Sequence, residues 1–315
     1  TPTTSSAASD VYKRQLCQLP LDRLQLPCFY ATRRCPQASC EQQNILLLCP
    51  KAHQNLVFLK ILWSRESCKS QKYTKYMVSK NELKQLAQLG QKKFRKQRRL
   101  FPVEGKKAIT TFHQNGFEMR YCFSLETAQI GGVAATTISA SDMKKLSNLS
   151  TPPNVWAAFS LPNPADFASQ NINIALDGIR NPGNLGTIIR LCDWFGIAHL
   201  LCSSDTVDCF NPKVVQASMG SLARVQLHYV DLLEAFETHG LLAVGTDSKG
   251  TNMYEAVLPQ NAVLVMGNEG QGISEAISAE ISENISIPAY GNPAAESLNV
   301  AMATGIVLAE FSRRG

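Results

Sequence analysis

The stretch RNPGNLGTIIRLCDWFG, residues 180–196, combines residue types and spacings that can hold a ligand. Two glycines, two asparagines and a proline follow the apolar run INIALD, and Arg190 stands six residues after Asn184. Glycine loops before helices hold nucleotide phosphates, but neither G-x-G-x-x-G nor G-x-x-x-x-G-K-S/T is present, so a dinucleotide or triphosphate cradle is weakly supported. The simplest structural interpretation is a glycine turn with Asn184 as a buried helix cap.

Two later segments also place glycine and small polar residues after apolar runs. They are VMGNEGQGIS, residues 265–274, and IPAYGNPAAESLNVAMATG, residues 287–305. In open α/β sheets the ligand sits beyond the carboxyl ends of the strands, so we expect the three segments to meet at one edge of a sheet. Glycine lets backbone groups approach a neutral ligand such as an adenosine, and apolar neighbours keep such a site dry.

The elements that must position these segments alternate along the C-terminal part of the chain. Apolar runs predict strands, and the segments between them predict helices. The strands are expected at 172–177, 198–203, 223–230, 241–247, 262–268 and 285–289, and the helices at 184–196, 211–219, 231–239, 274–280 and 297–312. This alternation predicts an α/β fold whose parallel sheet is covered on both faces.

A small α/β module of about sixty residues is expected before that part, preceded by a basic helix. Helical spacing of apolar residues among lysines and arginines predicts one amphipathic helix that begins at Ser79 or Asn81 and includes Leu83, Leu86, Leu89 and Phe94. Strands are predicted in LFPVE, RYCFSLE, AATTIS and NVWAAFSLP, and helices after the turn at Gly105 and in SDMKKLSNL. We expect this domain to span 77–161, with a polar linker at 162–170 that contains two prolines.

Together, the three segments resemble the three signature motifs of the SpoU/TrmH family, which belongs to the SPOUT superfamily of RNA methyltransferases. The first motif is matched by Asn184 and Arg190, the second by Gly267 and Glu269, and the third by Ile287, Pro288, Ser297, Leu298 and Asn299. The resemblance covers residues 171–315, and residues 77–161 resemble the family's small substrate-binding domain. Three motifs in the family's order are a far more specific signal than one.

The resemblance implies a parallel sheet whose C-terminal segment forms a trefoil knot, which no periodicity could reveal. It implies S-adenosylmethionine as the cofactor, a homodimer formed through the knotted domain, and ribose 2′-O-methylation of rRNA or tRNA. The implied catalytic residues are Asn184, Arg190, Glu269, Ser297 and Asn299. The cofactor is expected to contact Gly245, Thr246, Gly267, Ile287 and Leu298.

The residue types limit the roles that this chemistry allows. An arginine is a poor base because its pKa lies above about 12, so we expect Arg190 to orient the ribose hydroxyl or an adjacent phosphate and to stabilise alkoxide charge. We expect Asn184 to fix its loop and to contact the substrate or Arg190. Glu269 is expected to accept hydrogen bonds from backbone amides and Arg190, either within the chain or across a subunit boundary, the alternative being an ordinary carboxylate at a helix N-terminus. The third segment is longer than in many relatives, which leaves the contacts of 290–296 open.

Charge is distributed unevenly along the chain. Residues 77–107 contain ten basic and two acidic side chains, whereas residues 171–315 contain fifteen acidic and seven basic ones. A basic arm on a mildly acidic body predicts contact with a polyanion, here RNA, although a solvated helical face is the alternative. The expected RNA-binding residues are Lys92, Lys93, Arg95, Lys96, Arg98 and Arg99.

The cysteines and the apolar runs restrict the class of protein. Six of the ten cysteines precede Met77 without a C-x-x-C pair, which argues against zinc, and we expect no metal site. The other four lie among apolar residues, as reduced core thiols do. No apolar run approaches the length of a membrane span, so we expect a soluble, cytoplasmic protein. Residues 1–76 lack sustained periodicity, and we expect a non-native or disordered leader there.

Two other functions compete with ribose methylation. A non-catalytic RNA-binding protein could retain the fold as a ribosome-assembly factor, but the intact Asn184, Arg190, Glu269 and Asn299 argue against it. Methylation of a guanine base is known in other SPOUT families, whereas the Ser-Leu-Asn ending resembles the ribose-directed branch.

Overall fold

The computed structural model describes residues 78–259, 261–291 and 297–314. The chain divides into two units, 1–68 and 69–315, and every described residue belongs to the second. The leader expected at 1–76 lies outside the described residues.

The first part of the described chain is the expected small α/β module. A four-stranded sheet has the order β1-β6-β2-β5, in which β1 and β2 both pair antiparallel with β6. Its elements are α2 (Lys80–Ala87), η2 (Gln88–Gly90), α3 (Lys92–Arg98), β1 (Leu100–Glu104), α4 (Lys106–Gln114), β2 (Met119–Ser124), β3 (Gln129–Ile130), β4 (Val133–Ala134), β5 (Thr136–Thr137), α5 (Ala140–Leu146) and β6 (Val155–Ser160). Ser79 caps α2 in a capping box with Glu82, which confirms the predicted helix start.

The single basic helix predicted from Ser79 onward is wrong, because the chain breaks between α2 and α3. Gln91 has an extended backbone, with φ of −99° and ψ of 134°, and a 3₁₀ turn precedes it. The Arg95 side chain folds back and donates to the carbonyl oxygens of Leu89 and Gly90, each at 2.9 Å. These bonds satisfy the carbonyls freed by the break.

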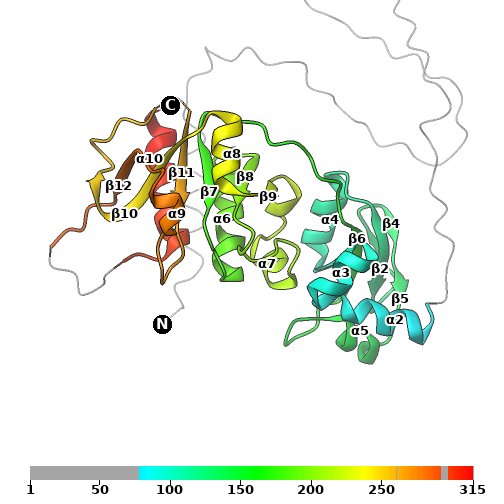
Figure 1. The fold of residues 1–315 in the computed structure, drawn as a ribbon. Helices are drawn as coiled ribbons and strands as arrows, with labels where there is room; N and C mark the ends of the chain where they lie inside the picture. The colour runs from blue at the N-terminus through cyan, green and yellow to red at the C-terminus, as the bar shows by residue number, and fades with distance from the viewer. Residues whose placement is uncertain (1–77, 260, 292–296, 315) are drawn as a thin grey trace, which may run out of the picture. The chain divides into compact units, whose positions relative to one another are not determined.

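The second part contains a six-stranded sheet of order β12-β10-β11-β7-β8-β9, in which every neighbouring pair is parallel (Figure 1). The strands are β7 (Asn173–Leu176), β8 (His199–Cys202), β9 (Gln226–Tyr229), β10 (Leu242–Asn252), β11 (Ala262–Met266) and β12 (Glu283–Ser286). The helices are α6 (Pro182–Trp194), α7 (Pro212–Ala217), η3 (Ser221–Ala223), α8 (Leu232–His239), α9 (Glu275–Ser278) and α10 (Val300–Arg314). The parallel α/β sheet was predicted, but β10 continues five residues beyond the predicted strand.

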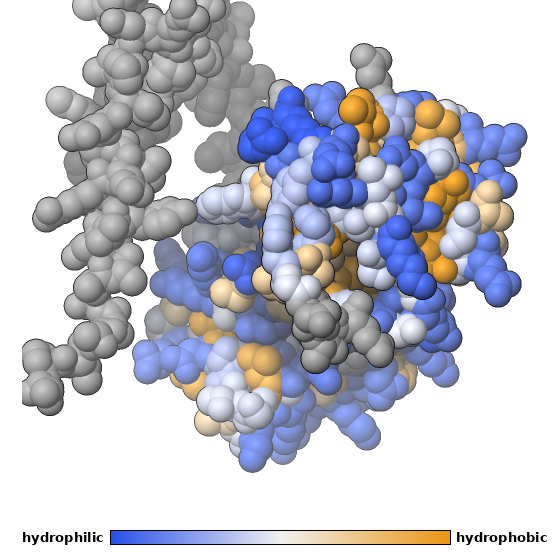
Figure 2. All heavy atoms as spheres, turned by 90° about the vertical axis from the view of Figure 1, so that its left-hand side faces the viewer, coloured by the Kyte–Doolittle hydropathy of each residue, from blue (hydrophilic) through white to orange (hydrophobic). Residues whose placement is uncertain are grey.

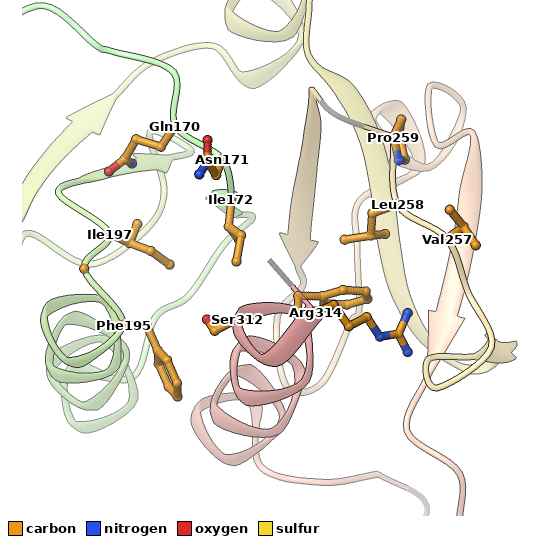
Figure 3. Close-up of a pocket in the computed structure, with 12 residues that line it drawn as sticks. Gln170, Asn171, Ile172, Phe195, Ile197, Val257, Leu258, Pro259, Ser312 and Arg314 are labelled. Carbon is orange, nitrogen blue, oxygen red and sulfur yellow. The ribbon is translucent and has the colours of Figure 1, made fainter. Parts of the chain in front are cut away.

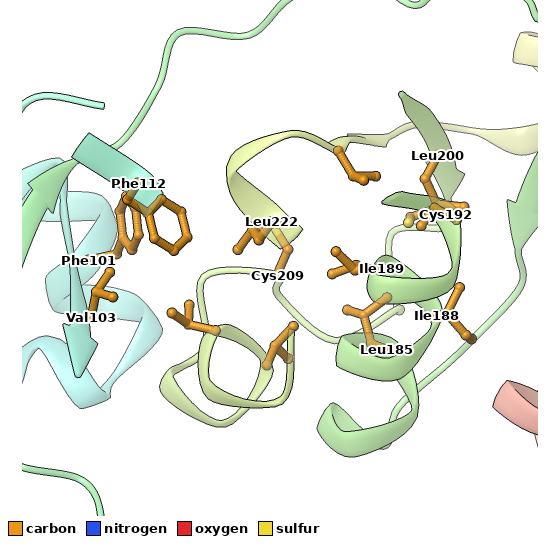
Figure 4. Close-up of a cluster of buried hydrophobic side chains, with 14 of the residues drawn as sticks. Phe101, Val103, Phe112, Leu185, Ile188, Ile189, Cys192, Leu200, Cys209 and Leu222 are labelled. Atoms are coloured by element: carbon orange, nitrogen blue, oxygen red, sulfur yellow. The ribbon is translucent and has the colours of Figure 1, made fainter. Parts of the chain in front are cut away.

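The central strands β7 and β11 are buried on both faces, as their apolar sequences predicted. Ile174 and Leu176 of β7 lie in one cluster with α6 residues such as Ile188, whereas Ala175 between them lies in another cluster with Phe236 of α8. Alternate side chains of one strand therefore enter different cores. The first cluster also includes Phe101, Val103 and Phe112 of the small module, so its apolar packing is continuous with the packing beneath α6 (Figure 4).

The segment between β6 and β7 contains no helix or strand in the described chain, and side chains fix its end. The Gln170 side chain accepts from the amide of Ala198 at 2.7 Å and donates to the carbonyl of His199 at 3.3 Å. Phe167 packs edge-on against His199, His228 and His239. Burial, followed by the neighbouring histidines, lowers the pKa of His228.

Four described cysteines are buried free thiols, namely Cys122, Cys192, Cys202 and Cys209, which confirms the prediction of reduced core thiols. Burial raises the pKa of Cys122 to about 11 and that of Cys192 to about 12. These cysteines are therefore poor nucleophiles at neutral pH. Within the described ranges, no cluster of three or more histidine, cysteine, aspartate or glutamate residues is arranged to hold a metal ion, and no helix is long and apolar enough to cross a membrane.

Candidate active site

The three glycine-containing segments leave the sheet at the same edge. β11 pairs in parallel with β7 on one side and β10 on the other, and β12 pairs in parallel with β10. Residues 177–181, 267–274 and 287–291 follow the carboxyl ends of β7, β11 and β12. The topology thus brings together the first and second segments, which contact each other across 90 residues of sequence.

The helix cap in the first segment is Asn181, not Asn184, so the cap predicted at Asn184 is wrong. The Asn181 side chain accepts from the amides of Gly183 and Asn184, and Pro182 occupies the first helical position. An asparagine followed by proline is a typical helix start and could have identified this cap from the sequence. Asn184 lies inside α6, where its side chain is available for other contacts.

A chain of side-chain amides joins the three segments at this edge. Asn184 Nδ2 donates to Oε1 of Glu269, and Asn184 Oδ1 accepts from Nδ2 of Asn299 at 3.0 Å. Oδ1 of Asn299 in turn accepts from the backbone amides of Ala301 and Met302. Each asparagine is thereby held in one orientation, because its carbonyl and amino groups have different partners. We call Glu269, Asn184 and Asn299 the amide relay.

The last helix begins at Val300, three residues later than predicted. Asn299 caps it, because its side-chain oxygen accepts from the amides of Ala301 and Met302 at the N-terminus of the helix. Ser297 is exposed and precedes the helix. Leu298, which directly precedes the relay residue Asn299, is 52% exposed and is therefore not part of the core.

Arg190 is exposed on α6 and is not a member of the amide relay. Six residues of helix turn it about 120° away from Asn184 around the axis. Among the residues that the structure describes, the Arg190 side chain has no hydrogen-bond or ion-pair partner, so the contacts expected with Asn184 and Glu269 are not made within one chain. Its guanidinium faces solvent, where an external anion or hydroxyl can reach it.

Glu269 lies in a tight hairpin that depends on glycine. Asn268 and Gly272 exchange two backbone hydrogen bonds, each of 2.9 Å, and Gly272 has a φ of +70°. A Cβ atom on Gly267 would lie 2.4 Å from the carbonyl carbon of Gly272. The hairpin can fold back against the strand end only because residue 267 has no side chain.

Gly245 and Thr246 of β10 are also at this edge of the sheet. A Cβ atom on Gly245 would overlap the Asn284 side chain, and the Thr246 hydroxyl donates to the Val265 carbonyl at 2.9 Å. That hydroxyl is therefore used within the sheet. A ligand contact at Thr246 would involve its backbone or its methyl group.

The site chemistry fits a neutral adenosine moiety. Among the described residues, the backbone amide and carbonyl groups of Gly267, Ile287 and Leu298 have no hydrogen-bond partner. The side chains of Ile287 and Leu298 are only partly covered, so apolar surface accompanies these backbone groups. Backbone donors and acceptors next to apolar side chains are the groups that recognise an uncharged heterocycle.

Arg180, which begins the first segment, was not among the predicted site residues. Its guanidinium donates to Asp205 Oδ2 at 3.0 Å, and Ser203 donates to Oδ1 of the same carboxylate. The Ser203 hydrogen bond, followed by the Arg180 hydrogen bond, lowers the pKa of Asp205. Because both partners are substantially exposed, this ion pair adds little to the stability of the fold. No motif in the sequence indicated that Arg180 and Asp205 would pair.

A cavity of about 810 Å³ lies at the opposite edge of the sheet (Figure 3). It is lined by residues near the starts of β7, β8 and β11 and by the end of α10, including Ile172, Ile197, Pro259 and Phe311. None of the predicted site residues lines it. The cavity is therefore separate from the edge at which the three segments meet.

Five of the six predicted RNA-binding residues reach the surface, but Arg95 does not. Arg95 is 2% exposed, and its guanidinium donates to Asp208 Oδ2 at 2.6 Å. Arg95 is therefore a structural residue, because its side chain links the turn between α2 and α3 to Asp208 in the second part of the chain. Lys92, Lys93, Lys96 and Arg99 are exposed, and Arg98 is half-buried with a hydrogen bond to Gln85.

Replacing Arg95 should destabilise the protein, whereas replacing the neighbouring lysines should not. Arg95→Ala leaves Asp208 without its cation and should lower the free energy of unfolding by about 3–5 kcal/mol in urea titrations. The double variant Lys92→Ala/Lys93→Ala should stay within about 0.5 kcal/mol of the parent, while its RNA affinity falls and depends less steeply on salt. An Arg95→Ala protein of unchanged stability would contradict the structural assignment.

Comparisons with known proteins match both parts of the chain. Residues 171–309 match the SpoU rRNA Methylase family, and residues 80–157 match the MRM3-like substrate binding domain. The 23S rRNA (guanosine(2553)-2′-O)-methyltransferase RlmP of Bacillus subtilis is 30% identical over 199 residues, which cover 61% of this chain and 76% of that protein.

Two solved structures share the fold over about three quarters of the chain. A Porphyromonas gingivalis protein assigned to the TrmH family of RNA methyltransferases is 38% identical, with a TM-score of 0.68. The match covers 76% of this chain and 100% of that one. An AdoMet-bound rRNA methyltransferase from Sinorhizobium meliloti is 27% identical, with a TM-score of 0.64 and coverage of 76% and 97%.

Proposed function

Because this chain belongs to the SpoU rRNA methylase family, we propose that it methylates a ribose 2′-hydroxyl of RNA with S-adenosylmethionine as the cofactor, and that its substrate is an rRNA. The amide relay is the observation that supports this proposal most. It joins Asn184, Glu269 and Asn299 from the three motif segments at the carboxyl edge of a parallel sheet. Ligands bind at this edge in open α/β sheets.

The cofactor would be held by backbone groups of Gly267, Ile287 and Leu298, with Gly245 and Thr246 forming another wall. When bound, S-adenosylmethionine supplies an electrophilic methyl group. The hairpin at Gly267 and the partly buried Ile287 suit the adenosine part, since their backbone groups have no hydrogen-bond partner among the described residues and lie beside apolar surface. Leu298 precedes the relay residue Asn299, so the cofactor wall and the relay are continuous in sequence.

Arg190 orients the ribose hydroxyl, or the phosphate next to it, and stabilises the negative charge that develops on the oxygen. An always-charged guanidinium is suited to this role, and its exposed position on α6 leaves it accessible to RNA. The hydroxyl proton passes to solvent or to a phosphate oxygen. Positioning of the nucleophile can lower the activation barrier of such a reaction by about 7–11 kcal/mol. The amide relay would contribute to this by holding the groups around the ribose in one arrangement.

The amide relay holds Glu269 with one carboxylate oxygen bound to Asn184. The other oxygen, Oε2, has no hydrogen-bond partner among the described residues. We assign it to a hydrogen bond from the substrate or from a second copy of the chain. Ser297, exposed just before the relay residue Asn299, completes the proposed set of catalytic residues.

We propose the domain boundaries at 77–161, 162–170 and 171–315, and a trefoil knot in the last of these. Packing of Val307 and Phe311 of α10 with Val244 of β10 supports a C-terminal segment that returns to the sheet.

Exposed apolar side chains on α6 and α10, such as Trp194 and Met302, support a homodimer through this domain. The face shown in Figure 2 carries apolar groups among hydrophilic ones.

The small module is proposed to bind RNA through its exposed basic residues. Lys92, Lys93, Lys96 and Arg99 lie on α3 and its cap, and the match to a substrate-binding domain covers the same segment. The four buried free thiols favour a reducing compartment, and we propose the cytoplasm.

The direct test is transfer of tritiated methyl from S-adenosylmethionine to purified rRNA and tRNA by the protein. Label is expected in rRNA, and label in tRNA alone would contradict the proposed substrate class. Tight cofactor binding without transfer to any RNA, including precursor particles, would favour the ribosome-assembly factor.

A further inference from the structure

We propose that Asn268 and Asp177 are positioning residues that clamp the Glu269 hairpin to the end of β7 and thereby set the geometry of the amide relay. This inference rests on the proposed function. Asn268 lies between the motif residues Gly267 and Glu269, and Asp177 ends the apolar run before the first segment. Neither residue was predicted to be part of the site.

Asn268 makes contacts on both sides of the hairpin. Its Oδ1 accepts from the amides of Gly270 at 2.9 Å and Gln271 at 3.2 Å, which folds the turn that carries Glu269. Its Nδ2 donates to the carbonyl of Gly178 at 2.7 Å. One side chain therefore shapes the hairpin and attaches it to another segment 90 residues away.

Asp177 holds the far end of the same loop. Asp177 is 8% exposed, and its Oδ2 accepts from the amide of Ser274 at 2.7 Å. Its own amide donates to the Met266 carbonyl at 2.9 Å, so the strand ladder extends to this residue. The loop is thus attached to residues 177 and 178 at its start and at its end.

The anchoring segment is itself fixed to the helix that carries Asn184. The Ile179 amide donates to the Thr206 hydroxyl at 3.2 Å, and its carbonyl accepts from the Val207 amide at 2.9 Å. Two residues later, Asn181 begins α6. Because the segment 177–184 is held by these bonds and leads directly into α6, attaching the hairpin to residues 177 and 178 ties Glu269 to the start of the helix that carries Asn184.

The test separates the two contacts of Asn268. Asn268→Ala removes all three hydrogen bonds, and we expect its single-turnover methylation rate at saturating S-adenosylmethionine and RNA to fall at least about tenfold. Asn268→Asp keeps the oxygen that shapes the turn but loses the donor to Gly178, so an intermediate loss is expected. Asp177→Asn, which keeps an oxygen for Ser274, should restore most of the rate lost in Asp177→Ala.

The matched control is Asp231→Ala, which also removes a side-chain oxygen from two backbone amides, those of Leu233 and Glu234. It should lower thermal stability without changing the rate. Hydrogen exchange at Gly270 and Gln271 gives a readout that does not require activity, and these amides should exchange faster in Asn268→Ala. Unchanged exchange, or faster exchange with an unchanged rate, would overturn the proposal. A parent protein that methylates no RNA would instead refute the proposed function while exchange still tests the clamp.

Discussion

Replacing Arg190 with alanine is expected to lower methyl transfer at least about hundredfold, as loss of one charge-stabilising group does in other active sites, with S-adenosylmethionine binding nearly unchanged. The guanidinium is exposed on α6 and lies outside the amide relay, so its loss should not disturb the relay. Single-turnover rates and cofactor titrations measure the two effects separately.

Arg224→Ala is the matched control for Arg190→Ala. Arg224 is also a partly exposed arginine beside α6, but it is paired with Asp193, whose pKa it lowers through a hydrogen bond. Its removal should leave the rate unchanged. For the lysine variant of Arg190, a new step in the dependence of rate on pH would contradict the charge-stabilising role and would support proton removal by residue 190.

Substituting Gly267 should weaken cofactor binding more than any side-chain change in the site. A Cβ atom would stand 2.4 Å from the carbonyl carbon of Gly272 and 2.5 Å from the Ile273 nitrogen, so the hairpin must move away from the strand end. Strain of this kind costs about 1–3 kcal/mol or more, and we expect Gly267→Ala to weaken S-adenosylmethionine binding at least about tenfold by calorimetry.

Gly305→Ala provides the comparison for Gly267→Ala. In α10, a Cβ atom at residue 305 would meet Leu191 at 3.4 Å, an ordinary contact, and alanine favours a helix. This variant should bind the cofactor as the parent does. If Gly267→Ala also bound normally, the hairpin could not be the cofactor wall.

The parallel sheet was predictable because strands buried on both faces leave short apolar runs in the sequence. The extension of β10 was not, since residues 248–252 are polar and the register with β12 shifts between Thr246 and Thr251 before pairing resumes at Thr251 and Asn252. There, Gly250 approaches the Asn284 carbonyl so closely that a Cβ atom would lie 2.5 Å from its oxygen. Backbone approach of this kind leaves no periodic signal.

The site was predictable only as a set of segments. Motif resemblance selected Asn184, Glu269 and Asn299, but their mutual contacts span 85 and 115 residues and depend on side-chain orientation. Arg95 was assigned to RNA because a basic run does not reveal which of its members finds a buried carboxylate. The roles of Asn268 and Asp177 likewise follow from distances that no local pattern contains.

The most direct test of the account is the chemical position of the transferred methyl group. rRNA labelled with tritiated methyl by the protein would be hydrolysed in alkali, which cleaves next to every free 2′-hydroxyl. Methylation of the ribose predicts that the label appears in an alkali-resistant dinucleotide. Label recovered in mononucleotides, on a methylated base, would contradict the proposal that this site acts on the ribose.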